Sequence, residues 1–163
     1  MEKILRSIFI VALFSLIIIA GDYQLKNQVD SWLKPVVSEG ELLSTNWIAT
    51  NTSEDDKFAA GIFGGELIMG MTTRVPLVGG DWANAPDPTQ NMADANEIFL
   101  TNSSKRAFDL CKKQNCTYVF VPMDRKIHTG YGWIDISSEK FSDQKYFDLV
   151  YENQDVQIYA VVL

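Results

Sequence analysis

The sequence predicts an α/β fold, in which a mixed sheet is covered by helices, closed by a C-terminal β-hairpin and preceded by one transmembrane helix. Three observations lead to this fold class. An apolar run, Ile4–Ala20, opens the chain, and beyond it short apolar strand patterns alternate with helical patterns. The last residues, from Phe147 to Leu163, have the pattern of two strands joined by a turn. A length of 163 residues is typical of one domain with an appendage.

The N-terminal apolar run is expected to anchor the chain in a membrane. Ile4–Ala20 contains one charge, Arg6, and as a helix it spans about 25 Å of a hydrocarbon core of about 30 Å. A cleaved signal peptide is the alternative, but Ile18-Ile19-Ala20 is a poor cleavage site. Because Lys3 and Arg6 precede the run, the positive-inside rule keeps the N-terminus cytoplasmic. We therefore expect a single-pass anchor over residues 1–21 and an extracytoplasmic remainder.

Two further segments are expected after the anchor. Residues 22–37 read as a juxtamembrane helix and linker, in which Pro35 ends the helix, and residues 38–163 read as the extracytoplasmic α/β domain. Ser38-Glu39-Gly40-Glu41 has the pattern of a capping box, which predicts the start of a helix over Leu42–Thr50.

The following segment reads as strand, turn and strand. Phe58–Phe63 predicts a buried strand that ends at Gly64-Gly65, and Glu66–Met71 predicts a short helical turn. Thr73–Val78 predicts a second strand, for which Pro76 favours an edge position.

The rest of the domain follows the same alternation. A loop is expected over Gly79–Gln90, a helix over Met92–Leu100, and a further helix from Ser103/Ser104 to Gln114. Tyr118–Met123 is a continuous apolar run and predicts a central strand. The remaining expectations are a loop over Asp124–Ile136, a polar stretch over Ser137–Lys145 for which a helix is one reading, and a closing hairpin of Phe147–Tyr151 and Val156–Leu163.

Charge and residue types exclude several classes of function. Beyond Gly21 there are 20 acidic and 12 basic residues, a net charge of −8, which argues against a nucleic-acid partner. The sequence has no histidine cluster, Cys-x-x-Cys pair or Walker loop, so we expect neither a metal nor a cofactor. The sole histidine, His128, reads as a loop residue. We assign no catalytic residue.

Three glycine-containing segments are candidate ligand-binding sites. Gly64-Gly65-Glu66 has the pattern of a strand-to-helix junction that can bind an anion through backbone N–H groups, although a tight turn explains it equally well. Gly79-Gly80-Asp81-Trp82 and Gly130-Tyr131-Gly132-Trp133 each place an indole in a glycine-flanked loop, where it can bind a sugar ring or a partner. The alternative is that Trp82 and Trp133 cover the core.

The cysteines and the acceptor triplets agree with an extracytoplasmic location. Cys111 and Cys116 either close a small disulfide loop or remain two buried thiols. Asn51, Asn102 and Asn115 each begin an N-x-Ser/Thr triplet, the acceptor pattern for N-glycosylation.

The order of motifs from Trp47 to Leu163 resembles a known family. The motifs are Trp47–Thr52 ("W-I-x-x-N-T"), Thr73-Arg74, the Gly79-Gly80 loop, Cys116–Val121 as an "x-Y-V-x-V" strand, and the "F-x-x-V-Y" and "V-x-I-Y" strands of the closing hairpin. In this order they are similar to the soluble C-terminal domain of polytopic membrane glycosyltransferases that use lipid-linked sugars, including the oligosaccharyltransferase catalytic subunit.

The resemblance implies a domain that follows a last transmembrane helix, and it adds Arg74 to the candidate ligand-binding residues. Where oligosaccharyltransferases have a WWDYG motif, this chain has Ile62–Glu66, without the tryptophans or the aspartate. The acceptor-reading role of that motif therefore does not transfer to this chain, and neither does the catalysis that such enzymes perform in helices absent here.

Two functions follow as expectations. The first is a membrane-tethered accessory or binding domain, not catalytic alone, that binds a polytopic membrane glycosyltransferase subunit or a glycan or acceptor. The second is a small cell-surface carbohydrate-active hydrolase or transferase built on the loop carboxylates around Asp81 and Asp87. Asp94 and Glu97 are further candidate carboxylates, and ordinary loop or helix-surface acids are the alternative reading of all four.

Overall fold

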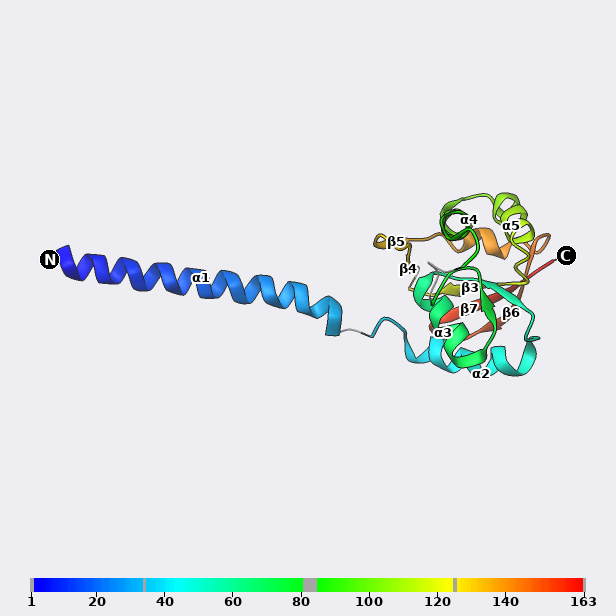
Figure 1. Ribbon diagram of the computed structural model, residues 1–163, viewed down its shortest axis with the longest axis horizontal. Helices are drawn as coiled ribbons and strands as arrows, with labels where there is room; N and C mark the ends of the chain where they lie inside the picture. The colour runs from blue at the N-terminus through cyan, green and yellow to red at the C-terminus, as the bar shows by residue number, and fades with distance from the viewer. Residues whose placement is uncertain (1, 34, 81–84, 125, 163) are drawn as a thin grey trace. The chain divides into compact units, whose positions relative to one another are not determined.

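The computed structural model describes residues 2–33, 35–80, 85–124 and 126–162. The chain divides into two compact units, Met1–Val36 and Val37–Leu163. The first unit contains helix α1 (Glu2–Leu33), and the second is a mixed α/β domain (Figure 1). The predicted fold class is confirmed.

Helix α1 is continuous from Glu2 to Leu33, so the juxtamembrane helix expected from residue 22 is its continuation. Its stretch Ile8–Leu25 is apolar, is not buried within the structure, and is long enough to cross a membrane. These properties fit a membrane anchor or a signal sequence.

Five strands form the main sheet of the domain, in the order β2-β1-β3-β7-β6. The strands are β1 (Lys57–Ala59), β2 (Val75–Pro76), β3 (Tyr118–Pro122), β6 (Phe147–Glu152) and β7 (Val156–Val161). Strands β2, β1 and β3 are parallel, and β7 and β6 complete the sheet as an antiparallel hairpin. The central position of β3, the edge position of Pro76 and the closing hairpin are confirmed.

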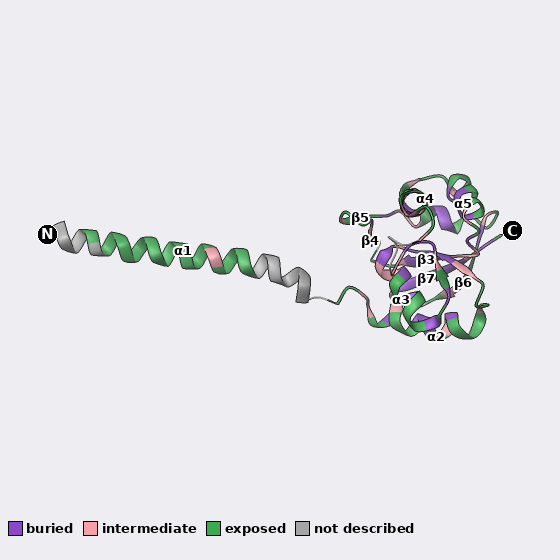
Figure 2. Cartoon of the chain, in the orientation of Figure 1, coloured by how far each residue is buried: buried purple, intermediate pink, exposed green. Residues whose placement is uncertain are grey.

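Helices cover both faces of this sheet (Figures 1 and 2). Because successive side chains of a strand point to opposite faces, Phe58, Phe120 and Ile158 form one core with α2 (Glu39–Asn51) and α3 (Ile62–Thr72). Val119 and Tyr159 form the other core with α4 (Pro88–Leu100) and α5 (Ser104–Lys113). Ser103 caps α5, as predicted.

The predicted strand Phe58–Phe63 is wrong in its second half. Strand β1 ends at Ala59, and α3 begins at Ile62, so that Gly64 and Gly65 lie inside a helix. A Cβ atom on Gly65 would lie 1.9 Å from the carbonyl oxygen of Val78, and one on Gly64 would lie 3.2 Å from the Phe120 ring. The two glycines therefore let α3 pack closely against its neighbours.

Two other segments that were expected to be loops contain regular structure. The expected loop Asp124–Ile136 contains an antiparallel pair, β4 (Lys126–His128) and β5 (Trp133–Asp135). Helix α4 begins at Pro88, within the expected loop, since proline at a first helical position loses no hydrogen bond. In Ser137–Lys145 the helical part is the single 3₁₀ turn Glu139–Ser142.

The N-terminus of α2 is fixed by its own sequence and by the β6–β7 turn. The predicted capping box is present: Glu41 N donates to Ser38 Oγ at 3.1 Å, and Ser38 N donates to the Glu41 carboxylate at 2.8 Å. From the turn, the Asp155 carboxylate accepts from Gly40 N at 2.7 Å, and Asn153 Nδ2 donates to Gly40 O at 2.8 Å.

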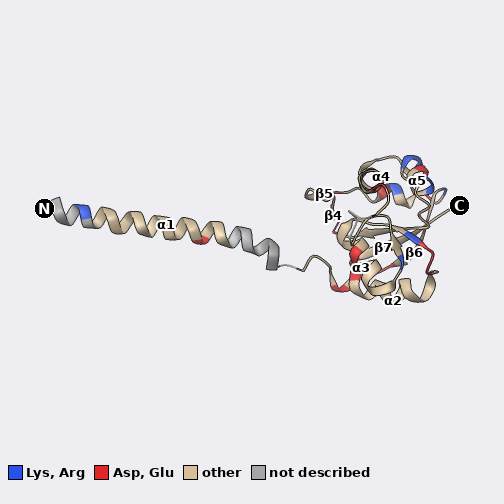
Figure 3. Ribbon diagram, in the orientation of Figure 1, with Lys and Arg blue, Asp and Glu red and all other residues tan. Residues whose placement is uncertain are grey.

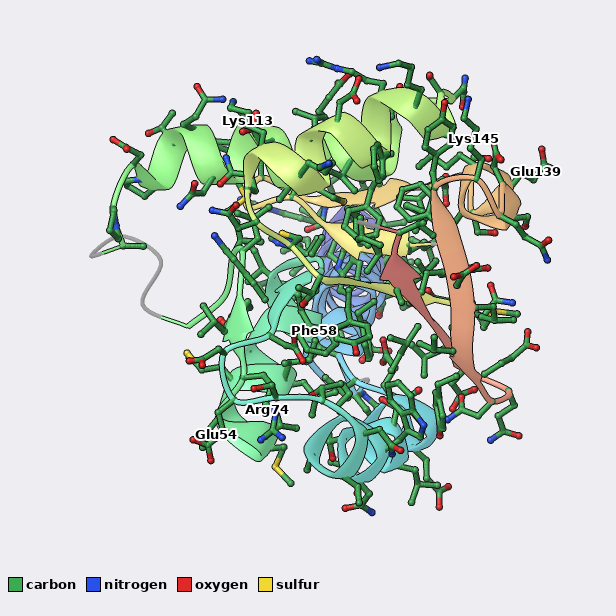
Figure 4. All side chains as sticks on the ribbon, turned by 90° about the vertical axis from the view of Figure 1, so that its right-hand side faces the viewer. Glu54, Phe58, Arg74, Lys113, Glu139 and Lys145 are labelled. Carbon is green, nitrogen blue, oxygen red and sulfur yellow. The ribbon has the colours of Figure 1, made fainter. Side chains whose placement is uncertain are left out.

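The C-terminal ends of α2 and α3 are joined by Arg74, which lies between the two helices (Figure 4). Its guanidinium donates to the carbonyl oxygens of Ala49 at 2.9 Å and Thr52 at 2.6 Å, at the end of α2. It also donates to Thr72 O, at the end of α3, at 2.7 Å. A cation at these carbonyl groups is favourable for both helix dipoles.

Lys140 has a similar role at the end of α4. It is buried, and its ammonium group donates to Phe99 O at 2.5 Å and to Ser137 O at 2.9 Å. Burial lowers the pKa of Lys140 to about 8, against an opposing effect of Glu97.

Replacing Arg74 tests the first of these caps. Arg74→Met should lower the free energy of unfolding by about 2–4 kcal/mol, because buried carbonyl groups at two helix ends lose a charged donor. Arg74→Lys should recover little of the loss, since one ammonium group cannot reproduce the fork of the guanidinium. Urea unfolding of both variants is the measurement. An equal loss in Lys112→Met, a change at an exposed lysine, would contradict this assignment.

Lys140 gives a pH-dependent prediction. Between about pH 8 and the unfolded-state pKa of 10.5, the unfolded chain binds a proton that the folded domain has released. Stability relative to a Lys140→Met variant should therefore rise with pH through this window, and should be lower and constant below it. Urea titrations of both proteins from pH 6.5 to about pH 10.5 measure the difference. A difference that does not change with pH would show that Lys140 keeps an ordinary pKa.

Candidate functional site

The β4–β5 hairpin forms the base of the candidate site. Its cross-strand pair Ile127 and Ile134 packs on the core, and Ile127 is buried. Gly61, at the start of α3, lies so close that a Cβ atom there would be 2.9 Å from Ile127 Cβ. The apolar pair thus fixes the hairpin against the N-terminal end of α3.

An aromatic cluster is formed by the side chains on the other face of this hairpin. His128 and Trp133 are opposite each other in register, and their ring centroids are 5.5 Å apart. Phe63, from the first turn of α3, lies 5.2 Å from the His128 ring and 5.4 Å from the Trp133 ring. Trp133 nevertheless remains 52% exposed. It therefore covers no core, and half of its surface is available to a ligand.

The turn of the hairpin presents Tyr131 to solvent. Thr129 N donates to Gly132 O at 3.0 Å, and Gly130 adopts a left-handed backbone with φ of 94°. Asn96, from α4, donates to Thr129 O at 3.3 Å and ties the turn to the domain. Tyr131 is 96% exposed, although the backbone on both sides of it is held by hydrogen bonds. We refer to Phe63, His128, Tyr131 and Trp133 as the aromatic hairpin surface.

The β4–β5 hairpin has no charged residue between Lys126 and Asp135, whereas the domain as a whole is acidic (Figure 3). Residues 127–134 contain no Asp, Glu, Lys or Arg. The charges nearest in the hairpin are Lys126 and Asp135, which are opposite each other in register. Residues 37–163 contain 18 acidic and 10 basic residues.

The other predicted ligand-binding residues are dispersed. Gly64 and Gly65 are occupied by helix packing, and Glu66 is an exposed residue within α3. Arg74 is buried, and its hydrogen bonds go to helix ends. Asp81 and Trp82 lie outside the described residues. Of the proposed set, the structure brings Tyr131 and Trp133 together on one hairpin.

Two of the candidate carboxylates, Asp94 and Glu97, are in contacts between helices, while Asp87 is exposed immediately before α4. Asp94 accepts from Lys113 at 2.7 Å and from Gln90 at 2.8 Å, and thereby joins α4 to α5. Burial of Asp94 opposes ionisation, but hydrogen bonds from Lys113 and Gln114 outweigh it and lower the pKa of Asp94. Glu97 lies 3.7 Å from Arg106 of α5. The part of the chain that the structure describes contains no group of three His, Cys, Asp or Glu side chains suited to a metal ion.

Cys111 and Cys116 are free, buried thiols in the structure. Burial raises the pKa of both thiols, that of Cys116 to about 12, so neither is a nucleophile at neutral pH. The disulfide stays a prediction. Asn51, Asn102 and Asn115 are all exposed, which leaves their predicted glycosylation sterically open.

Two members of the aromatic hairpin surface were not foreseen. Phe63 was placed in a strand and His128 in a solvated loop. The signal for the hairpin was nevertheless present, because Lys126-Ile127-His128 and Trp133-Ile134-Asp135 alternate around a glycine-containing turn. The contact of Phe63 with the hairpin is long-range and has no local sequence signal.

Comparison with known proteins shows the fold. No protein-family model matches the chain, and no curated protein matches it by sequence. The C-terminal globular domain of an oligosaccharyltransferase from Archaeoglobus fulgidus superposes with a TM-score of 0.57. The match covers 78% of this chain and 100% of that chain, at 12% sequence identity. The α/β unit therefore has a fold that resembles the soluble domain of an oligosaccharyltransferase, as the motif order led us to expect.

The exposed position of the aromatic hairpin surface leads to a stability prediction. Tyr131→Ser should change the free energy of unfolding by less than about 0.5 kcal/mol, and Trp133→Ala should lower it by about 1 kcal/mol. Phe120→Ala, a change at a fully buried ring, should cost about 3–5 kcal/mol. Thermal unfolding of the three variants makes the comparison. A loss for Trp133→Ala as large as that for Phe120→Ala would identify Trp133 as a core residue.

Proposed function

We propose that this chain is a membrane-tethered, extracytoplasmic accessory domain that works beside a polytopic membrane glycosyltransferase and is not catalytic alone. The observation that supports this most is the fold likeness, which extends over the whole of an oligosaccharyltransferase soluble domain. The apolar stretch Ile8–Leu25 supplies the tether, and Arg6 before it favours a cytoplasmic N-terminus.

A binding role agrees better with the side chains than a catalytic one. Of the candidate carboxylates, Asp94 and Glu97 are held in contacts between α4 and α5, whereas Asp87 is exposed immediately before α4. Both cysteines are buried, and burial raises the pKa of each thiol. The aromatic hairpin surface, in contrast, is exposed, ordered by hydrogen bonds and free of charge, as recognition surfaces often are.

The proposed partner is a multi-helix membrane protein, and the first contact with it is through α1. The apolar stretch Ile8–Leu25 is not buried within the structure, so a neighbouring helix bundle can pack on its exposed apolar side chains. The α/β unit would then lie beside the extracytoplasmic loops of that partner, where glycans and acceptors are bound.

A comparative pull-down tests this function. The full chain is solubilised in mild detergent and captured, beside a matched variant in which residues 1–25 are replaced by an unrelated apolar helix of equal length. The native chain should recover a polytopic glycosyltransferase, and the variant should recover much less of it. Equal recovery of the same proteins by both chains, or recovery of no such enzyme, would contradict the proposal.

A further inference from the structure

We propose that the tip of the β4–β5 hairpin inserts Tyr131 and Trp133 into the headgroup layer of the bilayer and so orients the domain on the membrane. This inference rests on the proposed tether. The interaction surface is the aromatic hairpin surface, and its partner is a zwitterionic lipid interface.

The residue types at the tip are those that favour this layer. Tyrosine and tryptophan are enriched at membrane–water interfaces, because each combines an apolar ring with a polar group that stays hydrated. Here Tyr131 is almost fully exposed and Trp133 is half exposed. Both are placed by a hairpin whose turn is bound to α4 through Asn96, so little conformational entropy is lost on contact.

The charge distribution is compatible with contact by the tip of the hairpin. The domain has a net negative charge, and burying charged side chains in a lipid interface is unfavourable. Within this hairpin, residues 127–134 contain no charged side chain. Lys126 and Asp135 at its base are of opposite sign.

The length of the tether permits the contact. Eleven residues separate Leu25, the end of the apolar stretch, from Val37, the start of the α/β unit. Because α1 continues to Leu33, eight of them are helical and rise about 12 Å, and three more residues add at most about 10 Å. This distance is shorter than the diameter of roughly 35 Å of a compact unit of this size, so the domain is held close to the bilayer. The resulting high effective concentration makes even a weak interfacial affinity sufficient.

The test places the full chain in phosphatidylcholine nanodiscs with bromine on the acyl chains near the headgroups. Phenylalanine replaces Trp32, Trp47 and Trp82, so that Trp133 is the only indole. The fluorescence of Trp133 should be quenched by the brominated lipid and blue-shifted relative to the detergent-solubilised chain. Adding Tyr131→Ser should reduce the quenching, since this change removes half of the tip without removing the reporter.

A matched control moves the reporter to another exposed position. In a chain with Trp133→Phe and Leu149→Trp, the new indole lies on β6, at the edge of the sheet, and should not be quenched. Equal quenching at both positions would show that the domain has no preferred face and would overturn the inference.

The remaining outcomes separate this inference from the tether on which it rests. If the chain stays in the nanodisc while Trp133 remains unquenched, the tether holds and the lipid contact is wrong. If added oligosaccharide protects Trp133 from quenching by aqueous acrylamide while the brominated lipid does not quench it, the aromatic hairpin surface binds a glycan and the lipid contact is wrong. A chain that does not remain in the bilayer overturns both the tether and the contact. Unchanged thermal unfolding of each variant confirms that the domain is intact.

Discussion

The contact of the Arg74 guanidinium with the carboxyl ends of α2 and α3 is the interaction on which one face of the domain depends. The buried residues of α2 are Gly40, Ser44, Thr45 and Ile48, and Ile48 contributes the large apolar side chain among them. Its position is therefore fixed by Ile48 in the core and by polar groups at both of its ends. Arg74 binds one end, and Asn153 and Asp155 bind the other from the β6–β7 turn. Because that turn belongs to the last strands of the sheet, contacts from the end of the chain help to fix the first helix of the domain.

The sequence predicted those elements that local chemistry determines. Ser38 and Glu41 form the predicted capping box, β3 is the central strand, and Pro76 is at an edge. The errors arose where a residue pattern has two local readings and a distant contact decides between them. Gly64 and Gly65 suggested the end of a strand, but the nearby Val78 carbonyl and the Phe120 ring require small residues within α3. The Arg74 cap was likewise not foreseen, since its acceptors at the end of α2, Ala49 O and Thr52 O, lie 25 and 22 residues away in the sequence.

The sequence predicted only part of the candidate site, because the other part depends on contacts between distant residues. Tyr131 and Trp133 were identified from a local glycine-flanked pattern. Their association with His128 depends on the register of β4 and β5, and that with Phe63 on the docking of the hairpin against α3. Together these residues form an uncharged aromatic surface on an acidic domain. The apolar stretch Ile8–Leu25, the oligosaccharyltransferase-like fold and this surface agree with the recognition role at a membrane that we propose.

The central claim, that the α/β unit is held on the outer face of a membrane, is tested most directly by labelling an introduced cysteine in intact cells. Lys105→Cys is suitable, because its side chain is 66% exposed on α5, while the native Cys111 and Cys116 are buried and give little background. The account predicts that a membrane-impermeant maleimide labels this variant in intact cells and that the labelled chain stays in the membrane fraction. Labelling only after lysis, or recovery of the labelled chain in the medium, would contradict it.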